Sequence, residues 1–340
     1  MHYELAKSLL FVYICNMNKP SVRIYEHASD LPPMVSTDYF HSPDLMLLCE
    51  RTPRHKPYMA VLSDGEGRVA AHMLAVVRYK RSWLPPWLVM HLRVMGDGEY
   101  DGDEHRQEWF GMMVDALVGR FGRRAFYMEF SHLSHKMFGY KKLRTSGFFP
   151  VKWMNIHNSL HSRSPEERIL PRQKRHIETA LGRGVVVGQV ETEQDFKGFD
   201  CLLHQHNWLR PWRYVPDGSF FRGLVESGRG RLYIAKYRDR VIGCCACVMS
   251  GGDAYLWYSS ARGKSYAPFY PRAVTVWQAI LDASASGMAH IRFVDVGLPL
   301  RKNPYRDFIL RFGGKEVSGY RWFRISIPWV NSVASWVYRE

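Results

Sequence analysis

The sequence predicts a mixed α/β (α+β) fold of two tandem domains, each a largely antiparallel mixed sheet flanked by helices. Two observations support this. The order strand–turn–strand–strand–helix–strand occurs in the first half of the chain and recurs in the second. The chain has 340 residues, which leaves room for two domains of ordinary size. A repeated order of elements without residue identity between the halves indicates a duplicated domain.

The first half shows the periodicities of strands and of one long helix. Apolar runs at residues 58–62 and 69–77 flank a turn at 63–67 and predict a hairpin, and residues 88–94 predict a further strand. Residues 104–121 carry Trp109, Met113 and Leu117 at helical spacing. Residues 125–130 and 147–156 are then expected to be strands.

A basic helical linker is expected at residues 164–184. Ser164 is a good N-cap, Pro165 suits the first helical position, and Glu167 lies three residues after the cap. Pro171 must interrupt or restart the helix, and Gly182 is expected to end it.

The second half repeats the order of the first. Helices are expected at residues 193–208, 219–226 and 273–285, and strands at 231–235, 241–249, 254–259, 291–296 and 316–327. The domains are therefore expected at 17–160 and 161–340. Residues 1–16 are interpreted as a loose or non-native extension, because Met17 looks like a more natural start.

The composition favours a polyanionic partner. The formal net charge is +15, which suits nucleic acid, an anionic membrane or a phosphate-rich substrate, although positive charge also serves solubility alone. The six cysteines form no CxxC pair and no spaced set with histidine that would suit zinc. We interpret them as buried, reduced thiols of a cytoplasmic protein and expect no metal site. No apolar segment approaches the ~20 residues that span a bilayer.

Two neighbouring segments carry a family resemblance. They read Phe293-Val294-Asp295-Val296-Gly297 and Tyr305-Arg306-Asp307-Phe308-Ile309-Leu310-Arg311-Phe312-Gly313-Gly314. The pair resembles the end of a GNAT-type acyltransferase domain as it occurs in the Fem family (FemABX) of peptidoglycan aminoacyltransferases. That family writes a strand ending near Asp-Phe-Gly and then Phe-Lys-x-x-Phe-Gly-Gly. Ile309 stands where the family has its Lys.

Weaker matches extend the resemblance over most of residues 50–326. Arg175-His176-Ile177, Ala180 and Gly184-Val185 resemble the basic helix before the second domain of the family. The resemblance implies two tandem GNAT-like domains and transfer of an activated acyl or aminoacyl group onto an amine, with a cell-envelope (peptidoglycan-type) precursor as the expected acceptor. Aminoacyl-tRNA or acyl-CoA is the implied donor. The implied partners are tRNA or a nucleotide-linked or lipid-linked precursor, with peripheral contact at the inner face of the membrane.

Three residues are candidates for the chemistry. Arg311 could meet a phosphate or the developing oxyanion, since transfer to an amine needs such a donor. Asp295 ends a strand, where it could orient the amine or accept its proton. Tyr258 could supply a hydroxyl. For each, the alternative is an ordinary structural role: a solvated Arg, a capping Asp and a core aromatic.

Substrate contacts are expected from residues near these. Trp208 and Arg213 belong to a segment that interleaves cations with indoles, as stacking sites do, and the other expected contacts are Tyr270, Arg272 and Phe308. Arg172, Lys174 and Arg175 could bind polyanion phosphates or could form a solvated helix face.

One observation keeps a second function open. A CoA-binding GNAT domain normally has a glycine-rich pyrophosphate loop, but residues 267–272 read Ala-Pro-Phe-Tyr-Pro-Arg. The alternative is a non-catalytic or acyl-CoA-dependent relative of the same fold that binds a polyanionic ligand.

Overall fold

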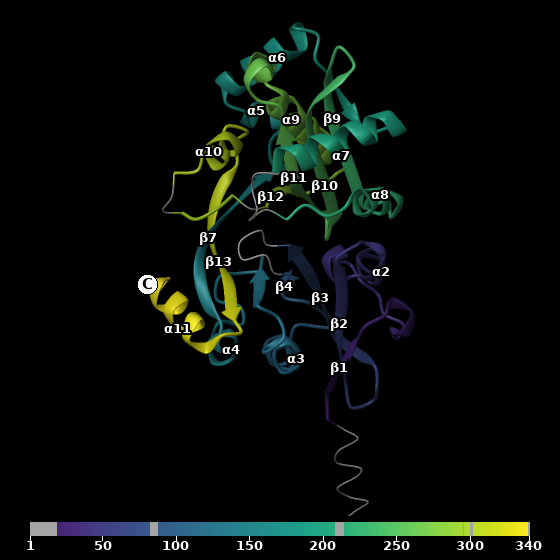
Figure 1. Ribbon diagram of the computed structural model, residues 1–340, viewed down its shortest axis with the longest axis vertical. Coiled ribbons are helices and arrows are strands. Elements are labelled where there is room, and N and C mark those ends of the chain that lie inside the picture. Colours follow the sequence, from purple (N-terminus) through teal and green to yellow (C-terminus); the bar gives the residue numbers. More distant parts are fainter. Residues whose placement is uncertain (1–18, 82–87, 208–213, 295, 300–301, 339–340) are drawn as a thin grey trace, which may run out of the picture. The chain divides into compact units, whose positions relative to one another are not determined.

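The computed structural model describes residues 19–81, 88–207, 214–294, 296–299 and 302–338. The expectation for residues 1–16 lies outside these ranges. The chain divides into two compact units (Figure 1). Unit 1 comprises Met1–Glu50, Arg54–Val151 and Tyr320–Glu340, and unit 2 comprises Arg51–Pro53 and Lys152–Gly319.

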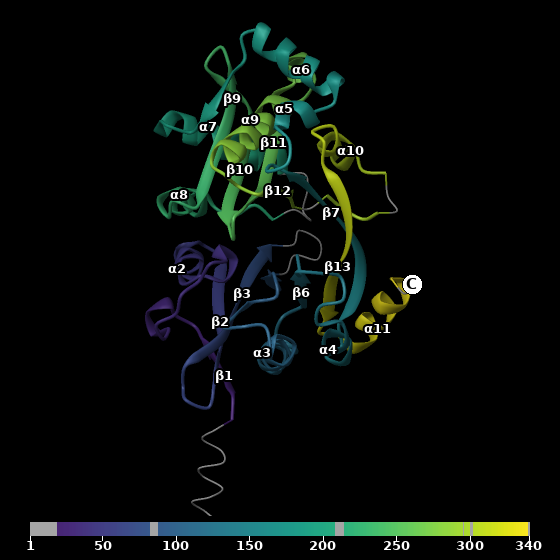
Figure 2. The same cartoon turned by 180° about the vertical axis from the view of Figure 1, so that it is seen from behind.

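The sheet of unit 1 is antiparallel except for one pair. Its order is β1 (Ser21–Tyr25), β2 (His55–Ser63), β3 (Val69–Arg81), β4 (Leu88–Met95), β6 (Tyr127–Ser131) and β13 (Lys315–Ile325), with β5 (Glu99–Tyr100) beside β3. Only β4 and β6 run parallel. The helices of unit 1 are α2 (Pro43–Arg51), α3 (Arg106–Phe121), α4 (Tyr140–Thr145) and α11 (Pro328–Val337), which Figure 2 shows from behind.

Unit 2 repeats this plan. Its order is β7 (Phe149–Ser159), β12 (His290–Phe293), β11 (Asp253–Ala261), β10 (Arg240–Ser250), β9 (Gly230–Tyr237) and β8 (Val186–Gln189), and only β11 and β12 run parallel. Its helices are α5 (Pro165–Arg168), α6 (Pro171–Gly182), α7 (Glu193–Asn207), α8 (Gly218–Glu226), α9 (Pro271–Ala285) and α10 (Pro304–Leu310). The series β2–β3–β4–α3–β6 and β9–β10–β11–α9–β12 match, so the expected α/β fold with a repeated order of elements is confirmed.

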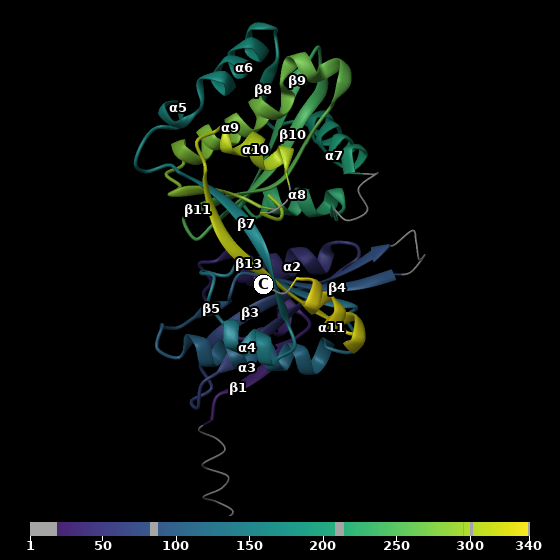
Figure 3. The same ribbon diagram turned by 90° about the vertical axis from the view of Figure 1, so that its left-hand side faces the viewer.

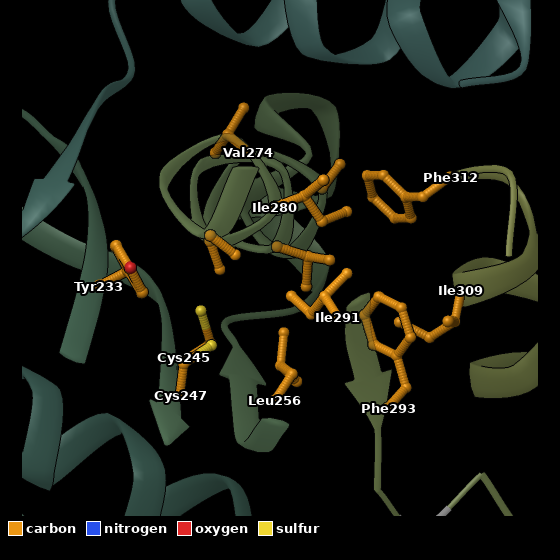
Figure 4. Close-up of a cluster of buried hydrophobic side chains, with 14 of the residues drawn as sticks. Tyr233, Cys245, Cys247, Leu256, Val274, Ile280, Ile291, Phe293, Ile309 and Phe312 are labelled. Carbon is orange, nitrogen blue, oxygen red and sulfur yellow. The ribbon is translucent and has the colours of Figure 1, made fainter. Parts of the chain in front are cut away.

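Alternation along the strands builds one core in each unit. In unit 1, the apolar face of α3 packs on Leu92, Val94 and Phe130. In unit 2, α9 packs on Cys245, Leu256 and Ile291, and Figure 4 shows these side chains meeting below the helix. The periodicity of two in the strands and of about 3.6 in the helices explains which side chains enter these cores.

The unit boundaries differ from the expected domains of 17–160 and 161–340. Unit 2 begins at Lys152, within β7, and residues from Tyr320 onward belong to unit 1. The reason is that β13 pairs with β6, where Trp322 lies opposite Phe130 and is fully buried. The last strand in the chain thus completes the first sheet.

The described cysteines are free thiols. Cys49, Cys244, Cys245 and Cys247 are buried as expected, whereas Cys201 is exposed. It lies on α7, whose buried stripe is formed by Phe196, Phe199 and Leu203 instead. Cys15 lies outside the described ranges.

Candidate active site

The parallel pair of unit 2 separates part-way along β11. Leu256 is paired with Phe293, where β12 ends, whereas β11 continues to Ala261. A register shift against β10, between Ala246 and Cys247, marks a bulge at the same level. Beyond Leu256, β11 therefore leaves the parallel ladder that it forms with β12. In unit 1 the corresponding parallel pair, β4 and β6, remains hydrogen-bonded up to the partners Met95 and Ser131.

Polar side chains gather where β11 ends. We define the β11-end cluster as His206, Asn207, Ser259, Ser260, Arg272 and Tyr305. The Ser259 Oγ lies 3.4 Å from the Tyr305 hydroxyl. On the opposite face of the strand, Asn207 Nδ2 donates to the Ser260 Oγ at 3.4 Å and to the Leu203 carbonyl at 2.7 Å. Both serines and Asn207 are buried.

Arg272 connects the two sides of this cluster. It stands in the first turn of α9, with Nη2 3.5 Å from His206 Nε2 and the guanidinium carbon 5.9 Å from the centre of the Tyr305 ring. The start of a helix carries partial positive charge from its free N–H groups. A full positive charge at the same place makes this position suitable for an anionic substrate group.

A second group of cations surrounds His176, on α6. The His176 ring stacks on Tyr270 with centroids 4.1 Å apart and 7° between the planes. Burial lowers the pKa of His176, and the charges of Arg172, Arg311 and Arg175 lower it further. The imidazole is therefore neutral near pH 7 and able to accept a proton, beside three cations that could hold phosphate. We call Arg172, Arg175 and Arg311 the His176 cations.

Local sequence explains how α6 presents these cations. Pro171 starts the helix, and Gln173, Ile177 and Ala180 are its buried residues. This spacing leaves Arg172, Lys174 and Arg175 exposed. The amide of Leu170, directly before α6, donates to the carbonyl of Arg311 at the C-terminal end of α10, over 2.9 Å, and so ties the end of α10 to the start of α6.

Several predicted site residues come together here. Tyr270 and the His176 cations form one group, and Arg272 belongs to the β11-end cluster, with Phe308 6.4 Å from the Tyr305 ring. Lys174 is exposed on α6. Tyr258 is only 6% exposed, and its ring packs on Phe221 at 5.4 Å. Asp295, Trp208 and Arg213 lie outside the described residues.

Sequence reasoning missed most of the β11-end cluster and the position of His176 between Tyr270 and the His176 cations. His206 and Asn207 end α7, far in sequence from the other members, and the two serines lie in a strand that otherwise reads as core. A signal for α10 was present in the Asn303-Pro304 pair, which is typical of a helix start: the Asn303 side chain accepts from the amides of Tyr305 and Arg306.

Ile309 does not face a cleft. Its side chain has no exposed surface and points into the core of unit 2 with Phe293 and Phe312 (Figure 4). The burial of Ile309 argues against a side chain in the cleft at this position, because an ammonium here would be buried without a partner.

The described ranges contain no group of three His, Cys, Asp or Glu side chains arranged to hold a metal ion. In the same ranges, no helix combines the length and apolar character needed to cross a bilayer.

Residues 172–305 match the acetyltransferase (GNAT) domain family. This range includes the β11-end cluster, His176, Arg172 and Arg175, while Arg311 lies just beyond it. Comparison with curated protein sequences yields no significant match. Solved structures are similar in fold. FemX has a TM-score of 0.58 at 11% identity, covering 91% of this chain and 96% of that one. L-PGS from Bacillus licheniformis has a TM-score of 0.57 at 8% identity, covering 91% and 100%.

A tandem GNAT protein from the clavulanic acid biosynthesis pathway is also similar, with a TM-score of 0.54 at 10% identity over 91% of this chain and 99% of that one. At these identities the structural likeness establishes the fold, while the family match concerns unit 2. The protein thus has the Fem-like tandem GNAT fold, and its second unit matches the acetyltransferase (GNAT) domain family over residues 172–305.

Proposed function

We propose that this protein is an acyltransferase that moves an activated acyl or aminoacyl group onto an amine of a cell-envelope, peptidoglycan-type precursor. The observation that carries the proposal is the site in the GNAT-matched unit 2, where β11 leaves its parallel partner beyond Leu256 and Arg272, at the start of α9, lies beside His206 in the β11-end cluster. The likeness to FemX and L-PGS favours an acceptor of the cell envelope, and we expect the protein to work at the inner face of the membrane.

The reaction needs no covalent enzyme intermediate. The amine nitrogen attacks the acyl carbonyl carbon, the bond from that carbon to the tRNA oxygen or the CoA sulfur breaks, and the amine gives up one proton. Backbone N–H groups of β11 would hold the carbonyl oxygen as it becomes negative. His176, which is neutral, is a candidate proton acceptor. We assign to Asp295 the orientation of the amine and to Tyr258 a hydroxyl contact.

Cations account for binding of the phosphates. Arg272 and Arg311 would hold a diphosphate or a tRNA phosphate near the reacting atoms, and Arg172, Lys174 and Arg175 would contact phosphates farther along tRNA or lipid. Tyr270, Phe308, Trp208 and Arg213 would contact the remaining substrate. Aminoacyl-tRNA and acyl-CoA are both candidate donors, and the absence of glycines at residues 267–272 favours aminoacyl-tRNA.

The test begins with mass spectrometry of small molecules that co-purify with the full chain. Transfer is then measured from labelled aminoacyl-tRNA and from labelled acyl-CoA to nucleotide-linked and lipid-linked cell-wall precursors. Arg311→Ala and Arg272→Ala should each slow transfer at least tenfold, about 1.4 kcal/mol. Arg229→Ala is the matched control, because Arg229 is exposed at the opposite end of β10. Lack of transfer and of binding with both donors would overturn the proposal.

The alternative is a protein that binds a polyanion without transfer. The exposed face formed by Arg172, Lys174 and Arg175, together with the net charge of +15, favours it. It predicts tRNA or lipid binding that weakens steeply with salt and a complete lack of transfer with every donor.

A further inference from the structure

The apolar face of α11 points away from the protein. Trp329 is 70% exposed, Val333 54%, Trp336 72% and Val337 61%, and no residue of the helix is buried. The spacing of four, three and one residues places these side chains on one face. Two tryptophans exposed to this degree on a single helix call for an apolar environment.

The polar face of the same helix holds it to unit 1. Asn331 accepts from the amide of Ile325 at 2.8 Å and donates to the carbonyl of Gly147 at 3.0 Å. The ring of Tyr338, just after the helix, stacks on Phe149. A cavity of about 390 Å³ separates Trp336 and Ser335 from Arg144 and Phe148. The orientation of α11 is thus opposite to that of an ordinary surface helix, whose apolar face points inward.

Neighbouring residues extend the surface and surround it with positive charge. The amide of Ser326 donates to the carbonyl of Phe126, and Arg324 Nη1 donates to the carbonyl of Gly122, so the α3–β6 loop lies against the end of β13, directly before α11. Phe126 is 40% exposed and Ile327 37% exposed. Three exposed cations border this surface, Arg123 and Arg124 in the loop and Arg144 on α4, while α11 itself has no charged residue. Figure 3 shows α11 with β13 and α4.

We propose that α11 is a membrane-docking helix. Its face of Trp329, Val333, Trp336 and Val337 enters the headgroup region of an anionic bilayer, while Arg123, Arg124 and Arg144 contact lipid phosphates. Tryptophan is the residue that prefers the bilayer interface, and an interfacial helix binds through apolar burial combined with basic side chains. An uncharged helix bordered by arginines, in a chain of net charge +15, is complementary to an anionic lipid surface. The inference is independent of the acyl group transferred and of the proposed reaction.

The test is sedimentation of the full chain with vesicles. One set contains phosphatidylcholine alone, and the other contains phosphatidylcholine with 30 mol% phosphatidylglycerol, at about 0.1 M salt, where charges are still felt over about 10 Å. The wild-type protein should bind the anionic vesicles at least tenfold more tightly than the neutral ones. Its tryptophan fluorescence should shift to the blue and be quenched by brominated lipid.

The variant Trp329→Ser/Trp336→Ser should weaken binding at least tenfold, and Arg123→Glu/Arg124→Glu should remove most of the preference for anionic lipid. Both should keep the wild-type melting temperature, since all four side chains are exposed. Val35→Ser is the control, because Val35 is 87% exposed elsewhere in unit 1.

Wild-type protein that does not bind anionic vesicles, or a tryptophan variant that binds them as tightly as the wild type, would overturn the proposal. So would a dimer that the tryptophan variant abolishes in sedimentation velocity without any lipid binding, because α11 would then be covered by a second copy. Transfer activity in solution would survive any of these outcomes.

Discussion

The burial of Ile309 shows which side chains of the segment after Asn303 face the core of unit 2. It is completely buried beside Phe293 and Phe312, on a seven-residue helix that also carries Phe308 and leads to Arg311. A single turn of helix therefore supplies both core and candidate site residues. Moving one position along this turn changes a side chain that faces the core into one that faces the site.

Substitutions at Ile309 should act on stability. Ile309→Ala should lower the free energy of unfolding by about 2–5 kcal/mol through the cavity it leaves. Ile309→Lys should lower it at least as much, because the ammonium would be buried without a partner. Ile309→Val, the control, should cost about 0.5–1.5 kcal/mol. Denaturant unfolding measures all three. A stable Ile309→Lys protein with faster aminoacyl transfer would show that the side chain reaches the cleft after all.

Glu129 lies at the centre of a buried ionic network in unit 1. His91 Nε2 is 3.0 Å from the Glu129 carboxylate, and Arg93 and Arg321 each lie 3.4 Å from it. Burial alone would raise the pKa of Glu129, but the charge of Arg93, contact with His91 and the charge of Arg321 hold it well below the usual range. Burial lowers the pKa of His91 to about 4, so His91 is neutral at pH 7.

This network should make the protein sensitive to acid. Between the unfolded pKa of 6.5 and the folded pKa of about 4, the unfolded state binds the additional proton on His91. The free energy of unfolding is therefore undiminished by His91 above pH 6.5. As the pH decreases toward 4, protonation of His91 in the unfolded state lowers it by about 3 kcal/mol. Denaturant unfolding at several pH values measures the slope. His91→Gln should flatten it between pH 4.5 and 6.5, and an unchanged slope in this variant would assign the effect to other groups.

At the scale of elements, a close contact between β10 and α9 positions the β11-end cluster. A Cβ placed on Gly243 would lie 2.7 Å from the carbonyl oxygen of Pro271, a backbone atom of the first residue of α9. The absence of a side chain at Gly243 lets the helix start close to the sheet. Arg272, the next residue, thereby comes within reach of His206.

Gly243→Ala should therefore disturb both packing and site. We expect a loss of about 1–3 kcal/mol in the free energy of unfolding, the usual cost of overpacking, together with slower transfer, because the start of α9 must move. Gly188→Ala on β8 is the matched control, since a Cβ at Gly188 meets nothing within 4 Å. Equal stability and transfer in the two variants would show that α9 does not depend on this contact.

At the scale of the whole molecule, the last strand of the chain completes the first sheet. Trp322 on β13 is buried in the core of unit 1, against the rings of Tyr140 and Tyr320. Unit 1 thus depends on a segment that follows all of unit 2, and the two units cannot be separated by a single cut.

A chain ending at Gly319 should leave unit 1 unfolded, because β6 would keep β4 but lose its second partner strand, and the core would lose Trp322. A chain ending at Ser326 is the control: it keeps β13 and removes α11, which buries no residue, so unit 1 should stay folded. Amide resonances and resistance to proteolysis distinguish the two. Native signals of unit 1 in the shorter chain would refute the dependence on β13.

Local patterns were sufficient to predict the repeated plan of strands and helices. Hydrophobic periodicity, turn residues and the Pro171 helix start all act over a few residues, and they agree with the observed β9–β10–β11–α9–β12 series. No element was predicted at residues 328–337, where α11 lies with its apolar residues exposed.

What the sequence determined by itself was the fold class and the residues that carry charge near the start of α9, including Arg272 and the His176 cations. Tertiary structure alone decided which of them meet. His206 and Ser259 join Arg272 from separate elements, Ile309 turns into the core, and β13 pairs with β6 of the first unit. Each of these outcomes depends on contacts between residues far apart in the chain, and periodicity within one segment carries no information about such contacts.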